Sequence, residues 1–154
     1  MKDIAINKLD LLRCELILQK IREEKQSYLS YFTPFDWNTN DFIEELKSCF
    51  KDQYFGLFVD SIPIGFYMLR GFDKGFKVPS YGIWISSEYS GLGFAKLSLN
   101  HAHCFCKVNK LSSIMLKVHP ENIIAKLMYQ KHGYVFSHID PDTGHGVYYF
   151  HFNK

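Results

Sequence analysis

Residues 81–95 of the chain read Tyr81-Gly-Ile-Trp-Ile-Ser-Ser-Glu-Tyr-Ser-Gly-Leu-Gly-Phe-Ala95, and this stretch decides the fold. Its first seven residues are apolar and aromatic-rich, which predicts a buried strand. Gly91 and Gly93 predict a tight turn, because glycine lets the backbone bend sharply and come close to a ligand. Apolar residues then recur at helical spacing, so the pattern indicates a strand, a glycine turn and a helix.

The helix that is expected to begin near Phe94 predicts an anion-binding site at its N-terminus. The N–H groups of a first helical turn lack partners within the helix, and the positive end of the helix dipole adds to their attraction for anions. A Gly-x-Gly turn is nevertheless common before helices, and a second motif is needed to support the prediction.

The second motif is the segment from Asn122 to Tyr134, which reads Asn-Ile-Ile-Ala-Lys-Leu-Met-Tyr-Gln-Lys-His-Gly-Tyr. Asn122 and Tyr129 are seven residues apart, or about two helical turns, so both are predicted on one helix face with Ala125 between them. Gly133 stands where a residue in the left-handed conformation is expected to end the helix.

Together the two motifs resemble those of the GCN5-related N-acetyltransferases, the GNAT superfamily. The cofactor loop of that family reads Gln/Arg-x-x-Gly-x-Gly/Ala, and residues 90–95 match it except that Ser90 replaces the first residue. The later helix of the family reads Asn-x-x-Ala-x-x-x-Tyr followed by a Gly-aromatic pair, and residues 122–134 contain all of it. The resemblance covers about the central third of the chain.

The resemblance implies acetyl-CoA as co-substrate, no metal, and a defined set of contacts. The pyrophosphate of coenzyme A is expected on the loop and first helical turn, at Ser90, Gly91, Leu92, Gly93, Phe94, Ala95 and Lys96. A backbone N–H in the Trp84–Ile85 region is expected to face the thioester oxygen. Asn122 and Ala125 are expected along the pantetheine arm, and Tyr129 is expected to protonate the leaving thiolate. On the residues alone, Asn122 is equally a helix cap and Tyr129 a ring packed on the sheet.

The general base is left open by the sequence. A lysine-like amine has a pKa of about 10.4, so a group must accept its proton near neutral pH. In the resemblance, Lys117 occupies the place where ribosomal-protein N-terminal acetyltransferases carry a glutamate base, and a cation cannot do that work. Glu88, His119, Tyr81 or an ordered water remain as candidates.

Composition limits the class of protein. The chain has 154 residues, which predicts one domain spanning residues 1–154. A hydrophobic content of 47% excludes a disordered chain, and a net charge of +2 without a basic run argues against nucleic-acid binding. The sequence has neither an apolar run of about 20 residues nor a signal-peptide pattern. Its four cysteines lack metal or disulfide spacing, so we expect a cytoplasmic protein with reduced thiols, as a monomer or homodimer.

The remaining elements predict the order β-α-α-β-β-β-α-β-α-β-β, an α/β fold with a mixed sheet flanked by helices. Expected strands are residues 3–6, 54–59, 62–69, 112–118, 134–139 and 147–152, and the expected early helices are 9–24 and 41–49. The apolar stripe of the first helix is expected to consist of Leu11, Leu12, Leu16, Ile17 and Ile21. Residues 70–79 are expected to form a solvated loop, whose cations Arg70, Lys74 and Lys77 are the nearest to a phosphorylated acceptor.

The acceptor is the least constrained part of the prediction. The aromatic segment 28–37 is equally consistent with core packing and with a pocket that stacks on a sugar. With the connection at residues 69–73, it is similar to acetyltransferases that modify amino sugars for surface polysaccharides. We therefore expect an N-acetyltransferase for a primary amine of a small acceptor. A protein N-terminal or lysine acetyltransferase is the alternative enzyme, and a non-catalytic acyl-CoA-binding module is the alternative of another class.

Overall fold

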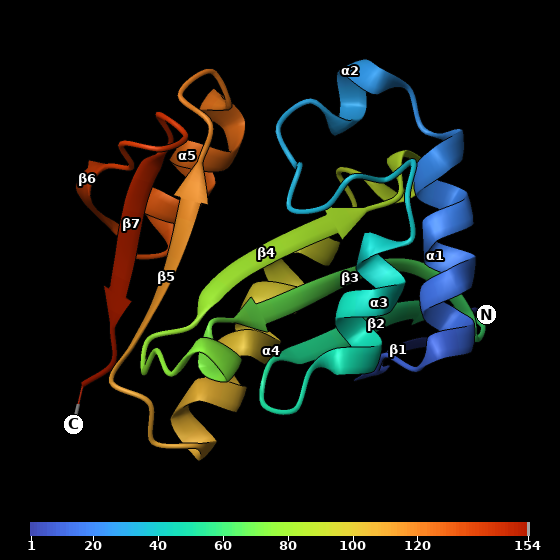
Figure 1. Cartoon of the computed structure of the whole chain (residues 1–154), viewed down its shortest axis with the longest axis horizontal. Helices are drawn as coiled ribbons and strands as arrows, with labels where there is room; N and C mark the ends of the chain where they lie inside the picture. The colour runs from blue at the N-terminus through green and yellow to red at the C-terminus, as the bar shows by residue number, and fades with distance from the viewer. Residues whose placement is uncertain (154) are drawn as a thin grey trace.

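The computed structural model describes residues 1–153 and contains one seven-stranded mixed sheet, with strand order β1-β2-β3-β4-β5-β7-β6 (Figure 1). The strands are β1 Ile4–Lys8, β2 Gln53–Val59, β3 Ile62–Arg70, β4 Ser80–Ile85, β5 Ser113–Val118, β6 Val135–Ile139 and β7 Gly146–His151. The α-helices are α1 Leu11–Glu23, α2 Gln26–Leu29, α3 Asp41–Ser48, α4 Phe94–Val108 and α5 Ile123–Lys131. The predicted fold class and order are confirmed, with the short helix α2 as an addition.

Strands β1 to β4 form an antiparallel half-sheet. The turn between β2 and β3 is the predicted one, and Asp60 and Ser61 both have positive φ, 47° and 66°. Two successive residues with positive φ give the turn that matches the right-handed twist of paired strands. The Asp60 carboxylate also accepts a hydrogen bond of 2.9 Å from the Asp3 backbone N–H, which ties β1 to the hairpin.

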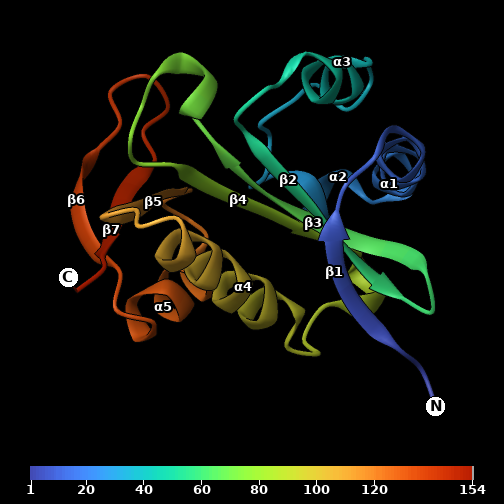
Figure 2. The same cartoon turned by 90° about the horizontal axis from the view of Figure 1, so that it is seen from below.

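Helices cover both faces of this half-sheet, and Figure 2 shows α1 and α3 on one side and α4 on the other. One core lies beneath α1 and α3, with Ile17, Phe42 and Phe66 fully buried. The second core lies beneath α4 and α5, where Leu99 packs with Tyr67 and Leu116. The sheet is therefore the rigid layer from which both helical layers take their position.

The helix α1 is confirmed, but the predicted apolar stripe is wrong at three of its residues. Its buried face is Cys14, Ile17, Leu18 and Ile21, which follow the i, i+3, i+4, i+7 spacing of a helix packed on a sheet. Leu11, Leu12 and Leu16 are 42%, 59% and 40% exposed. Cys14 takes the place of a leucine because a free cysteine packs as a small apolar residue.

Strands β4 and β5 are parallel, and they separate after two paired positions. Ser80 pairs with Met115 and Tyr81 with Leu116, and no further pair between residues 1 and 153 joins these strands. Figure 1 shows them diverging toward α2 and α5. Beyond Tyr81, the backbone of β4 therefore has no strand partner among the described residues on the side that faces β5. The candidate site is built on this free edge.

Candidate functional site

The predicted glycine turn directly precedes α4. Gly91 and Gly93 have φ of 76° and 92°, the left-handed region that glycine adopts without strain, and Gly93 is the N-cap of α4. Leu97 donates the first N–H of the helix, to the Gly93 carbonyl. The N–H groups of Phe94, Ala95 and Lys96 precede it, so they point out of the helix end.

The space in front of this turn is open. A Cβ built on Gly91 or on Gly93 would meet nothing within 4 Å among the residues that the structure describes. The Ser90 hydroxyl donates to the Ser87 carbonyl at 3.0 Å, and so it stabilises the turn in place of the family's long polar side chain. Leu92 is 67% exposed beside the loop. A free first turn behind two open glycines fits a phosphate group.

The released edge of β4 supplies backbone donors. The Ser86 N–H bonds to Ile64 of β3, and since alternate residues of an antiparallel strand face the same neighbour, the Trp84 N–H also faces β3. The N–H groups of Ile83 and Ile85 therefore face the gap between β4 and β5. Of the two residues that the sequence singled out as an oxyanion donor, Ile85 has its N–H in the gap and Trp84 does not.

Two hydroxyphenyl rings lie at the end of this gap, and both come from residues 26–31, which we call the α2 segment. The Tyr28 hydroxyl donates a 2.6 Å hydrogen bond to the Ile85 carbonyl, at the end of β4. The Tyr31 ring lies 4.8 Å from the His119 ring, just past the end of β5. The α2 segment thus reaches from one separated strand to the other.

The aromatic segment 28–37 divides between the core and the gap. Leu29 and Trp37 are buried, and Phe32 and Phe35 pack against the same core. Tyr28 and Tyr31 remain 38% and 40% exposed at the gap.

The Asn122 side chain accepts a hydrogen bond from the Ala125 N–H at 3.3 Å, so Asn122 caps α5. Among residues 1–153, no group accepts a hydrogen bond from its amide N–H groups, which are therefore available as donors. Gly133 has φ of 90° and ends the helix as predicted.

Tyr129 lies inside the core that joins α5 to the sheet. Its ring centroid is 6.5 Å from that of Tyr81, the last residue of β4 that pairs with β5, and 5.7 Å from that of Tyr134. Burial raises the pKa of Tyr129 above its usual value, so the phenol is protonated at neutral pH. The phenol therefore stands beside the point where β4 and β5 separate, as a potential proton donor.

The candidate bases differ in their surroundings. The Tyr81 hydroxyl is buried on the α4 side, 2.7 Å from the Ser98 hydroxyl, and burial holds the pKa of Tyr81 well above 10. Glu88 is exposed in a short turn after β4. His119 is half-buried at the end of β5, beside Tyr31. Tyr81 is thus the least suited of the three to accept a proton.

The sequence did not indicate that Asp140 and His145 would lie near the site. Lys117 donates to the Asp140 carboxylate at 2.7 Å, and this hydrogen bond is the largest of several that lower the pKa of Asp140 to about 2. The His145 ring centroid lies 5.2 Å from that of His119. The sequence showed only that both residues flank a hairpin turn, and only the pairing of β7 with β5 brings them beside Lys117 and His119.

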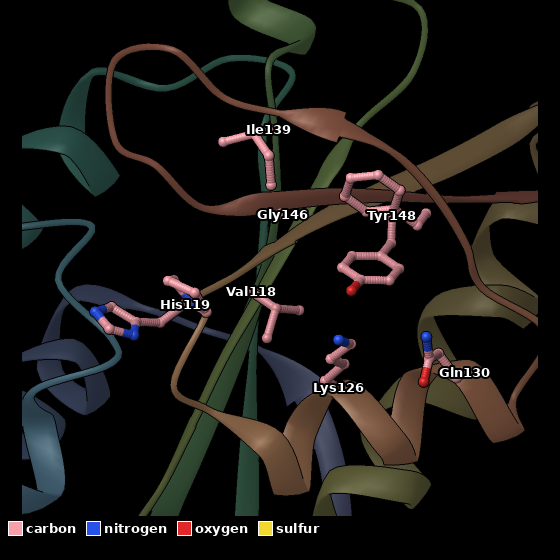
Figure 3. A pocket seen from close by; sticks show the side chains of 9 residues that line it. Val118, His119, Lys126, Gln130, Ile139, Gly146 and Tyr148 are labelled. Carbon is pink, nitrogen blue, oxygen red and sulfur yellow. The ribbon is translucent and has the colours of Figure 1, made fainter.

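A cavity of about 330 Å³ lies on the far side of β5, between α5 and the β6–β7 hairpin. Figure 3 shows Lys126 and Gln130 of α5 pointing toward Tyr148, with Val118 and Ile139 nearby. The glycine turn and Tyr129 are not among the residues that line it. The cavity is therefore separate from the predicted cofactor site. Of the residues that line it, only His119 also lies beside the gap.

Among residues 1–153, no group of three or more His, Cys, Asp or Glu side chains is placed to hold a metal ion. His101 is instead 2.7 Å from the Tyr67 hydroxyl, and His103 is 2.7 Å from the Tyr134 hydroxyl. None of the helices in the same range is long and apolar enough to cross a membrane.

The chain is similar to several solved acetyltransferase structures. The PaiA N-acetyltransferase of Thermoplasma acidophilum, in complex with coenzyme A, is 19% identical with a TM-score of 0.78 over 97% of this chain and 99% of that one. A GCN5-related N-acetyltransferase from Kribbella flavida is 14% identical, with a TM-score of 0.78 over 97% and 98%. RimL, a ribosomal L7/L12 alpha-N-protein acetyltransferase, is 11% identical with a TM-score of 0.78 over 97% and 90%. At these identities the likeness establishes the fold.

No curated protein sequence matches this chain. A family model does match it: residues 18–134 match the model of the acetyltransferase (GNAT) family, which is more than half of the chain. That range contains the glycine turn, the separated strands and the α5 motif. The chain therefore belongs to the GNAT family of acetyltransferases, enzymes that transfer an acetyl group from acetyl-CoA.

Proposed function

We propose that this enzyme acetylates the primary amine of a small acceptor, with an amino sugar as the preferred acceptor class. The observation that carries the proposal is the glycine turn of α4 beside the separated strands, with the Tyr129 phenol at the point of separation. These features give a site for a diphosphate at one end and a protonated phenol at the other.

Each residue has a distinct task in the proposed reaction. The N–H groups of Phe94, Ala95 and Lys96 hold the pyrophosphate, with Gly91 and Gly93 keeping the approach open. The Ile85 N–H donates to the thioester oxygen, where negative charge develops in the transition state.

Two residues of α5 serve the thiol part of coenzyme A. The Asn122 amide donates to the pantetheine arm while its oxygen caps the helix beside Ala125. Tyr129 gives its proton to the departing sulfur, because its raised pKa keeps the phenol protonated at neutral pH.

The exposed rings of Tyr28 and Tyr31 support the amino-sugar class. Aromatic rings at a site mouth offer an apolar face with a polar tip, which suits a sugar ring with its hydroxyl groups. Lys117 argues against a base of the ribosomal-protein type, because it is a cation paired with Asp140. A protein N-terminus or lysine remains the alternative acceptor, favoured by the fold likeness to RimL.

The cofactor site is tested by Gly93→Val against Gly75→Val. Both glycines have positive φ, 92° and 86°, and open space around a built Cβ, so both substitutions impose a similar backbone strain of about 1–3 kcal/mol. Only the valine at position 93 also blocks the proposed phosphate position. Calorimetry should show coenzyme A affinity at least about tenfold weaker for Gly93→Val, which corresponds to about 1.4 kcal/mol.

The control variant Gly75→Val should bind coenzyme A as the wild type does. Equal affinity in both variants would place the pyrophosphate elsewhere. Turnover of acetyl-CoA with panels of amino sugars, peptides and polyamines then separates the acceptor classes. A wild-type protein that binds coenzyme A and acetylates none of them would be the non-catalytic module.

A further inference from the structure

His119 and His145 lie side by side at one end of the β5–β7 ladder, one from each of two neighbouring strands. His119 follows β5 directly and His145 precedes β7 directly, and the last pair of the ladder between these strands is Val118 with Gly146. Their ring centroids are 5.2 Å apart, and Tyr31 approaches His119 from the α2 segment. His119 therefore stands at the edge of the gap, and His145 stands directly behind it, because β7 lies on the side of β5 away from β4.

The hydrogen bond at His119 fixes which of its nitrogens carries the proton. The backbone N–H of Glu121 donates to Nδ1 of His119 at 3.1 Å. A nitrogen that accepts a hydrogen bond bears the lone pair, so the neutral ring carries its proton on Nε2. His119 therefore has an Nε2–H to donate. It can take up a second proton only on Nδ1, and it would then lose its bond from Glu121.

His145 has the opposite character. Within residues 1–153, its ring makes no hydrogen bond to another side chain or backbone group, so a nitrogen lone pair is free. Burial, followed by the neighbouring His119 and the Lys117 ammonium, lowers the pKa of His145, and only Asp140 acts in the other direction. The Asp140 charge is itself largely engaged by Lys117. His145 is thus neutral at pH 7 and able to accept a proton.

We propose that His145 is the general base of the acetyl transfer, directly or through one water, and that His119 positions the acceptor through its Nε2–H. This inference rests on the proposed function and deepens it, since it names the proton acceptor that the sequence left open. It also gives the two imidazoles different tasks, because His119 accepts a hydrogen bond on its ring and His145, within the described part of the chain, does not.

The proposed transfer removes two protons from the acceptor nitrogen. His145 takes one proton from the acceptor ammonium, and the free amine attacks the acyl carbon. The C–N bond forms and the C–S bond breaks. Tyr129 gives its proton to sulfur and is reprotonated by the second proton that leaves nitrogen. His145 releases its proton to solvent, so the overall reaction yields an amide, a thiol and one proton.

The test compares two small amines that differ in their need for a base. Ethylamine is an ammonium ion at pH 7, whereas 2,2,2-trifluoroethylamine is already neutral because its fluorines withdraw electrons. His145→Gln keeps a polar side chain that does not titrate. With ethylamine its kcat/KM should fall about 10²-fold, the lower range for a general base, and with trifluoroethylamine it should stay close to wild type.

The controls separate a base from a positioning residue. His119→Gln should reduce the rates with both amines by the same factor, because a donor that positions the acceptor serves either of them. His138→Gln, on the exposed strand β6, should change neither rate. The wild-type rate with ethylamine should also fall in acid as His145 becomes protonated, and this acid limb should be lost in His145→Gln.

Equal losses with both amines in His145→Gln, or no loss with either, would overturn the assignment of the base while leaving the proposed function intact. A wild-type enzyme that acetylates neither these amines nor any member of the acceptor panels would overturn the proposed function, and this inference with it. Coenzyme A affinity measured by calorimetry should be the same in all four proteins. A weaker affinity in His145→Gln would mean that the substitution acts through the cofactor site, and this too would overturn the assignment.

Discussion

The two sides of the gap between β4 and β5 are built differently. One side is the half of the sheet formed by β1 to β4, which we call the thick half. Its strands β2 and β3 are buried along nearly their whole length between two helical layers. The other side is the half formed by β5, β7 and β6, which we call the thin half. Helix α5 covers one of its faces, and every residue of the edge strand β6 is exposed. The proposed oxyanion donor, Ile85, belongs to the thick half. Lys117, His119, Asp140 and His145 all belong to the thin half.

This difference suggests a division of labour. The N–H that is proposed to face the thioester oxygen must not move, and it belongs to a strand with neighbours on both faces. The groups that are proposed to meet the acceptor stand at strand ends and in a hairpin loop, where substitution disturbs little packing. We infer that acceptor specificity in this enzyme is set mainly by the thin half and the α2 segment.

The largest expected effect is on stability and compares the two halves directly. Phe66→Ala removes a fully buried ring from between β3 and the α1–α3 layer, and it should lower the free energy of unfolding by about 3–5 kcal/mol. Phe136→Ala, on β6, removes a ring that is 49% exposed and contacts Tyr148, and it should cost no more than about 1 kcal/mol. Urea unfolding measures both. Similar losses would mean that the halves are equally packed.

The next effect is on catalysis at the junction between the halves. Tyr129→Phe keeps the buried ring and removes the proposed proton donor, so kcat should fall by about 10²–10⁴-fold while coenzyme A affinity and the thermal melt change little. Tyr149→Phe is the matched control, since that ring lies on β7 stacked against His151. A folded Tyr129→Phe enzyme with wild-type kcat would leave Tyr129 as a packing residue alone.

The sequence predicts the strands and helices of both halves, for a physical reason. The β2–β3 hairpin, the glycine turn and the helix after it depend on local signals, namely alternation, positive-φ residues and helical spacing. The stripe of α1 was misassigned because Leu11, Leu12 and Leu16 are apolar residues that the fold leaves exposed. Apolar side chains on a surface are common, so apolarity alone does not identify the packed face.

The site was predictable only where it lies within one segment. Residues 90–96 and the α5 motif are each continuous in the sequence, and so their spacing carries information. The approach of His145 to His119 depends on β7 pairing beside β5, and the contact of Tyr31 with His119 joins residues 88 positions apart. Such contacts follow from strand order, which no local pattern encodes.

The smallest expected effect concerns the Lys117–Asp140 ion pair of the thin half. The pair is partly exposed, so it contributes little to stability at neutral pH, and Lys117→Ala should leave coenzyme A affinity and turnover at pH 8 intact. Loss of turnover with unchanged affinity would instead reveal a catalytic task for Lys117. A modest rise in the pKa of His145 should follow, because a neighbouring cation is removed and the Asp140 charge is freed.

The Lys117–Asp140 pair should also make the free energy of unfolding depend on pH. The hydrogen bond from Lys117 is the main reason that the pKa of Asp140 is about 2, below the value of about 3.9 expected in the unfolded chain. A lowered carboxyl pKa stabilises the folded state above the unfolded value, and that contribution is lost as the pH falls toward 2. Urea unfolding should therefore show a small, constant deficit in Lys117→Ala above about pH 5, which shrinks between pH 4 and pH 2. A deficit that persists unchanged at pH 2 would mean that Lys117 stabilises the hairpin by packing its methylene chain, since packing does not depend on the charge of Asp140.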